Sequence, residues 1–213
     1  MLKCNILLME IENFIITQPV FHELRIKRSV FLGSLLPAET RDIAEEVIAT
    51  LRSKYHDATH NCFAYRIDAD EWRYSDDGEP SGTAGKPILA MLEKYQLVQC
   101  VLVVTRHFGG IKLGTGGLIR AYSQCAEETI QISPREKLVR YQIYSLQYAY
   151  HFSRNIHYLV SKFNGEWVDS QFTEVVRSII RVPEETAQSF ADEVLSAGNG
   201  QIELVEISNP GTV

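Results

Sequence analysis

The chain has 213 residues, 45% of them hydrophobic and 23% charged, a composition typical of globular proteins with one or two compact domains. Its formal net charge of −6 excludes a protein that coats nucleic acid by bulk electrostatics, although a local basic patch is compatible with it. No run approaches the roughly 18 apolar residues that span a bilayer, and the apolar N-terminus is short and lacks a cleavage site. We therefore expect a cytoplasmic protein that does not bind membranes.

The apolar pattern predicts a first domain that mixes strands and helices. Residues 1–20 show only a weak pattern, and the alternation of apolar and polar residues over 23–33 predicts a strand or a hairpin. Apolar residues at helical spacing predict an amphipathic helix over 40–54. The later elements are a hairpin of 61–67 and 71–75, a short helix over 86–94, a strand buried on both faces over 100–105, and a helix over 114–132.

A change of composition at residues 133–137 marks the boundary between domains over 1–134 and 135–213. The second domain has the order β-α-β-β-α-β, which is the split βαβ or ferredoxin-like plan. Its elements are 139–148, 151–163, 166–172, 174–182, 184–197 and 201–207. Because strands and helices do not alternate strictly in the first domain, the fold class is α+β.

Two glycine-rich runs, residues 75–87 and 106–120, contain most of the 13 glycines and are the predicted functional region. Glycine is used where the backbone turns sharply or approaches another group closely. The first run opens with Asp76, Asp77 and Glu79, whereas the second carries basic residues and no acid. An anion is therefore expected to prefer the second run.

The second run can present consecutive backbone N–H groups as a nest at a helix start, where the helix dipole places about half a positive charge. The alternative is that its glycines only allow a helix to pack closely on a sheet. We favour binding, because close packing needs one or two glycines and this run has more. The candidate residues are Arg106, Gly109, Gly110, Lys112, Gly114, Gly116, Gly117 and Arg120.

The first run does not fit the phosphate loop G-x-x-x-x-G-K-[ST] of nucleotide hydrolases. Pro80 stands where the first glycine is needed, and Pro87 replaces the hydroxyl residue that would hold magnesium. Two interpretations stay open: Ser81 or Thr83 helps the N–H groups of a helix start to hold an oxyanion, or caps that helix. The candidate residues are Gly82, Thr83 and Lys86.

Acids and histidines next to these runs are weaker candidates. Asp76, Asp77 and Glu79 can perform acid–base chemistry or bind a cation only if they converge, and Asp-Gly is also common turn chemistry. The alternative is that Arg106 or Lys86 pairs with one of these acids. His56 and His60 have the spacing of two metal ligands, but the helix is expected to end between them, so we assign only His60 to the site, as a hydrogen-bonding residue. No nucleophile motif is present, which argues against a nucleophilic hydrolase. We expect no metal, no cofactor and a binding protein rather than an enzyme.

Cysteines and aromatic residues outside the runs have structural interpretations. The cysteines form no C-x-x-C pair, which favours buried free thiols over a disulfide framework: Cys4, Cys62, Cys100 and Cys125. Aromatic residues of the second domain can stack on bases or pack in the core: Tyr141, Tyr144, Tyr148, Tyr150 and Phe152. Core packing is favoured, since this domain has six basic and ten acidic residues from Glu136 on.

Residues 60–66, 75–87 and 103–122 closely resemble the signature of the IMPACT/YigZ family. The resemblance covers roughly residues 20–130, and the second domain matches the bacterial YigZ arrangement. It implies a first domain like domain IV of ribosomal translocation factors, a two-layer α/β sandwich of ribosomal-protein type, and a ferredoxin-like second domain like their domain V. It also implies an RNA-binding or ribosome-associated role in translation regulation. The nest and the basic residues of the second run add a phosphate-like anion as the contacted group. The alternatives are an enzyme acting on a small phosphorylated or nucleotide-like molecule and a protein-interaction module.

Overall fold

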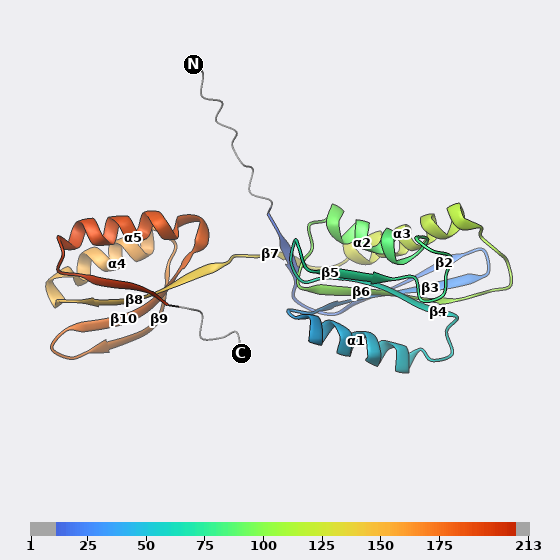
Figure 1. The fold of residues 1–213 in the computed structure, drawn as a ribbon, viewed down its shortest axis with the longest axis horizontal. Helices are drawn as coiled ribbons and strands as arrows, with labels where there is room; N and C mark the ends of the chain where they lie inside the picture. The colour runs from blue at the N-terminus through green and yellow to red at the C-terminus, as the bar shows by residue number, and fades with distance from the viewer. Residues whose placement is uncertain (1–11, 208–213) are drawn as a thin grey trace, which may run out of the picture. The chain divides into compact units, whose positions relative to one another are not determined.

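The computed structural model describes residues 12–207, in two units that divide between Leu138 and Val139 (Figure 1). The expected boundary after residue 134 lies a few residues before this division. Strand β7 (Arg135–Lys137) accordingly belongs to the first unit, where it pairs antiparallel with β1 (Phe14–Ile16). The sequence did not indicate either strand, because three residues are too few to show a period.

The first unit is built on a five-stranded antiparallel sheet in the order β2-β3-β6-β4-β5. The strands are β2 (Val20–Ile26), β3 (Ser29–Pro37), β6 (Cys100–His107), β4 (His60–Arg66) and β5 (Trp72–Ser75). Both expected hairpins are present, and the central strand β6 is the predicted strand that is buried on both faces.

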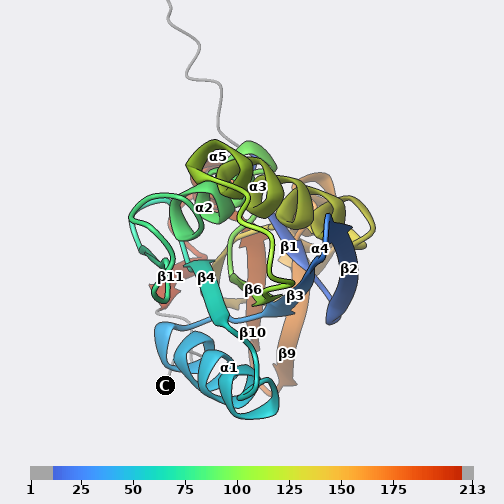
Figure 2. The same cartoon turned by 90° about the vertical axis from the view of Figure 1, so that its right-hand side faces the viewer.

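Helices cover both faces of this sheet, α1 (Arg41–Lys54) on one and α2 (Gly85–Lys94) and α3 (Thr115–Gln131) on the other (Figures 1 and 2). In β6, Val103 packs toward α1, whereas Val104 packs into the core under α2 and α3. The two-layer sandwich that the resemblance implied is therefore wrong, since this unit has three layers. The reason is the uninterrupted apolar run of β6, which requires a cover on each face.

Helix α1 forms as the apolar spacing predicted. The Thr40 hydroxyl accepts the Ile43 N–H at 3.3 Å and caps the helix start. Ala44, Ile48 and Leu51 form its buried stripe. The helix ends at Lys54 and His60 begins β4, so His56 and His60 do not share a helix face.

The second unit has the expected element order, with strands β8 and β10 at the centre of an antiparallel sheet ordered β11-β8-β10-β9. Its elements are β8 (Tyr141–Tyr148), η1 (Tyr150–Phe152), α4 (Ser153–Lys162), β9 (Glu166–Phe172), β10 (Val176–Pro183), α5 (Glu184–Gly198) and β11 (Glu203–Ile207). Tyr144 and Tyr148 are buried in its core, as the packing interpretation predicted, whereas Tyr150 is half exposed. Over residues 12–207, no helix is long and apolar enough to cross a membrane.

Candidate functional site

The first glycine run folds around the carboxylate of Asp76. Its Oδ1 accepts the N–H groups of Ala84 and Gly85, each at 2.9 Å, and its Oδ2 accepts the Gly82 N–H at 2.8 Å. The Thr83 hydroxyl donates to the Pro80 carbonyl at 2.7 Å. The anion at the start of α2 is therefore the chain's own Asp76, which uses the N–H groups expected to hold an oxyanion. Lys86 is exposed in the first turn of α2.

Asp77 also has internal partners, different from those of Asp76. One oxygen accepts the Arg52 guanidinium and the other accepts the Asn61 N–H, both at 2.7 Å. Asp77 and Gly78 have φ values of 44° and 89°, the left-handed region used by Asp-Gly turns. The two adjacent carboxylates thus organise a turn and do not converge as an acid–base pair.

A buried ion pair joins the two runs. Glu79 Oε1 accepts a hydrogen bond from Arg106 Nη1 at 2.5 Å. Only 4% of the Glu79 side chain and 6% of the Arg106 side chain are exposed to solvent. The Tyr122 hydroxyl donates to the same Glu79 oxygen at 2.9 Å, and Arg106 Nη2 donates to Ser29 Oγ at 3.3 Å. Arg106 is therefore paired with an acid of the first run, which was the alternative to its assignment as a ligand of an external anion. We call Glu79, Arg106, Tyr122 and Ser29 the polar centre.

His60 and Cys62 attach the first run to strand β4. His60 Nδ1 donates to the Asp77 carbonyl at 2.8 Å, and its Nε2 lies 3.9 Å from Glu79 Oε2. Cys62 Sγ donates to the Asp76 carbonyl at 3.0 Å and lies 3.4 Å from the Tyr122 hydroxyl. Burial raises the pKa of Cys62 and the pKa of Tyr122, so both groups stay protonated. The hydrogen-bonding role expected of His60 is therefore within the fold.

The three described cysteines should be unreactive in the native protein. Cys62, Cys100 and Cys125 are free and buried, as predicted, while Cys4 lies outside the described residues. Burial raises the pKa of Cys100 and the pKa of Cys125 to about 12, and only the thiolate reacts readily. In a Cys4→Ser protein at about pH 8, near the pKa of an unfolded thiol, we expect negligible labelling by Ellman's reagent. Three thiols should react after denaturation; rapid labelling without denaturation would contradict this burial.

The glycines of the second run serve different purposes. A Cβ on Gly109 would lie 1.8 Å from the Arg28 carbonyl oxygen, and one on Gly117 would lie 3.0 Å from Leu113 Cβ, so these two allow close packing. Two others have φ values that favour glycine, 84° at Gly110 and 72° at Gly114.

Neither close packing nor a left-handed backbone explains the glycine at position 116. It lacks a left-handed φ, and an added Cβ would meet only Arg120 Nη1, at 3.6 Å. The missing side chain leaves the first turn of α3 open next to a guanidinium group. Close packing thus explains two of the five glycines and turn geometry two more, whereas neither accounts for Gly116.

The start of α3 is an exposed, positively polarised end. The N-cap residue Gly114 offers no side chain to the N–H groups, and the Leu118 N–H bonds to the Gly114 carbonyl at 2.9 Å. Lys112, Gly116 and Arg120 are exposed. The 17-residue helix adds its dipole to these two cations. The loop that leads from β6 into α3 is seen in Figure 2. This arrangement, called here the α3 site, can hold a phosphate-like anion.

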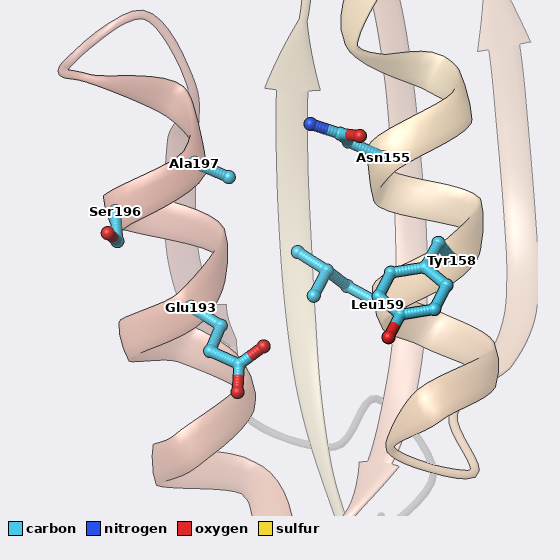
Figure 3. A pocket seen from close by; sticks show the side chains of 6 residues that line it. All are labelled: Asn155, Tyr158, Leu159, Glu193, Ser196 and Ala197. Atoms are coloured by element: carbon cyan, nitrogen blue, oxygen red, sulfur yellow. The ribbon is translucent and has the colours of Figure 1, made fainter.

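The second unit has a pocket of about 320 Å³ between α4 and α5 (Figure 3). Its lining residues are Asn155, Tyr158, Leu159, Glu193, Ser196 and Ala197. Glu193 is already paired with Lys162 at 2.6 Å. Since neither glycine run contributes to it, this pocket is separate from the predicted site.

Comparison with known proteins identifies the family. The model of the Impact N-terminal domain matches residues 27–130, which include both glycine runs. An IMPACT family member of Haemophilus influenzae is 34% identical over 194 residues, which cover 88% of this chain and 94% of the relative. The chain belongs to the IMPACT family.

Two further matches extend over both units of this IMPACT family member. YigZ of Escherichia coli is 31% identical, over 85% of this chain and 91% of the relative. A crystal structure of a hypothetical protein is 30% identical, with a TM-score of 0.64, over 93% of this chain and 98% of that one. The family predicted from the motifs is thereby confirmed, together with the α+β class.

Proposed function

We propose that the protein binds RNA through the α3 site. The observation that carries this proposal is the position of the Arg120 guanidinium next to Gly116, at a helix start that no side chain caps. Phosphate is the anion that fits both partners, since a helix N-terminus offers N–H groups and a dipole, and arginine offers a bidentate donor.

The distribution of charge supports an extended phosphate-bearing partner. Between residues 106 and 120 there is no acid, and the two exposed cations there are Lys112 and Arg120. Arg106 does not contribute, because Glu79 neutralises it in the interior. The resemblance of the family to ribosomal translocation factors, through the ferredoxin-like plan of the second domain, favours ribosomal RNA and a role in translation regulation. Fold analogy alone is a weak argument, so the proposal depends on the site.

An enzymatic alternative has less support. Acid–base chemistry needs a carboxylate that is free to exchange a proton with a substrate. Asp76 and Asp77 are instead hydrogen-bonded to backbone N–H groups and to Arg52.

Replacing Arg120 by alanine should weaken RNA binding about tenfold, the effect of losing a charge-assisted contact. It should also lower the salt slope of binding by about one. Fluorescence anisotropy with a ribosomal RNA fragment, over a range of salt concentrations, measures both. Lys112→Ala should act in the same direction.

The matched control is Arg154→Ala, which removes an exposed arginine from the first turn of α4 in the second unit. It should leave the affinity unchanged. If Arg120→Ala together with Lys112→Ala binds as the wild type does, the α3 site is not the RNA site.

A further inference from the structure

We infer that the RNA held at the α3 site is single-stranded there, and that one of its unpaired bases stacks on the ring of Phe108. This inference rests on the proposed function and adds which form of RNA the site selects.

Phe108 is exposed although it directly follows the most buried strand of the sheet. Phe108 is 42% exposed to solvent, and it is the first residue of the loop that carries Lys112 and leads to Arg120. Ile111 and Ile119 in the same segment are also exposed, at 38% and 42%. An exposed ring in the same acid-free segment as two exposed cations, Lys112 and Arg120, matches the two parts of a nucleotide, its base and its phosphate.

The backbone under Phe108 is fixed on both sides of the residue. The Phe108 N–H donates to Thr59 Oγ1 at 3.0 Å, and the Gly109 N–H donates to Ser29 Oγ at 3.4 Å. Gly109 also lies so close to the Arg28 carbonyl that no side chain would fit. A ring on such a backbone loses little freedom when a base stacks on it.

Arg106 of the polar centre contacts the Phe108 ring from the protein interior. The Arg106 guanidinium carbon lies 5.3 Å from the centre of the Phe108 ring and 5.5 Å from that of the buried Phe31 ring. Arg106 thus lies within cation–π range of both rings and is held by Glu79. The buried arginine therefore positions the exposed aromatic surface and does not itself contact the RNA.

Stacking on Phe108 requires a base whose face is free. Within a duplex each base is covered on both faces by its neighbours, so away from its ends a duplex offers phosphates to Lys112 and Arg120 but no base face to Phe108. A single strand can place phosphates on the cations and a base on the ring. The site should therefore distinguish paired from unpaired RNA.

The test uses the full-length protein and three probes: a 12-nucleotide RNA without self-complementarity, the same strand annealed to its complement, and the same strand with abasic residues. Wild type should bind the intact single strand roughly tenfold tighter than the other two, the effect of one stacked base. Phe108→Ala should reduce the affinity for the single strand to that for the abasic strand, and Phe108→Trp should preserve the preference. Ile43→Ala, which removes a similarly exposed apolar side chain from α1, is the matched control and should keep it.

The outcomes separate the two claims. Equal affinity for all three probes, still weakened by Arg120→Ala, would overturn the stacking inference and leave the proposed function standing. No binding of any probe or of ribosomal RNA by the wild type would overturn both. If nuclease-treated captures retain a partner protein that Phe108→Ala releases, and no RNA binds, the ring is a protein contact and both fail. Thermal unfolding of Phe108→Ala checks that the protein is folded.

Discussion

Replacing Glu79 by alanine should lower the free energy of unfolding of the first unit by about 3–5 kcal/mol, because a buried charge is left unpaired. The change leaves the Arg106 guanidinium without its carboxylate partner, although Arg106 is only 5% exposed, and it also removes the acceptor of the Tyr122 hydroxyl. Urea denaturation, followed by fluorescence with and without Glu79→Ala in a protein that also carries Trp167→Phe, measures this loss of unfolding free energy. Of the chain's two tryptophans, only Trp72 in the first unit then reports by fluorescence.

The control for this change is Glu23→Ala, which breaks an exposed ion pair with Arg25 at 2.6 Å. That loss should stay below about 1 kcal/mol. Removing both buried charges, with Glu79→Leu and Arg106→Met, should recover much of the stability lost in Glu79→Ala. Equal losses in Glu79→Ala and Glu23→Ala would show that the polar centre does not stabilise the fold.

Phe31→Ala should cost about 3–5 kcal/mol, the usual effect of removing a buried phenyl ring. Phe31 has 0% exposure and meets the Tyr122 ring edge-on at a centroid distance of 5.2 Å. Its loss opens a cavity between the apolar core under α3 and the polar centre. The same tryptophan signal reports the shift of the urea midpoint.

Phe21→Ala provides the comparison, since Phe21 lies on the neighbouring strand β2 and is 54% exposed. Its replacement should cost less than about 1 kcal/mol, because little apolar area returns to water. A comparable cost for both phenylalanines would contradict the assignment of Phe31 to the core.

Elements with a pattern in consecutive residues were predictable. Helix α1 shows its stripe within 14 residues, and the hairpin of β4 and β5 shows its turn between two short apolar segments. Strands β1 and β7 were not, because each exists only through a partner that lies over a hundred residues away. The three layers followed from the two-sided burial expected of β6, but the family analogy pointed to two.

The site was predictable to the same extent. The contrast in charge between the runs is a property of neighbouring residues and led to the α3 site. The sequence did not show that Asp76 acts as the internal anion of the first run. Asp76 accepts the N–H group of Gly85, and the two residues lie farther apart in the sequence than a helix cap and its partner usually do. Pairing of Arg106 with an acid of the first run was an open alternative, but the choice of Glu79, 27 residues earlier, depends on how strand and loop meet in space.

The pairing of β1 with β7 also affects how the first unit can be connected to other sequences. Phe14 is aligned with Lys137, and the Leu138 N–H donates to the Asn13 carbonyl at 2.8 Å. The described part of this unit therefore begins and ends at adjacent points. Domains with adjacent ends tolerate insertion into a host loop and circular permutation. The first unit thus has the geometry of a transferable module, provided that the transferred segment includes Asn13 to Leu138 and so keeps both strands.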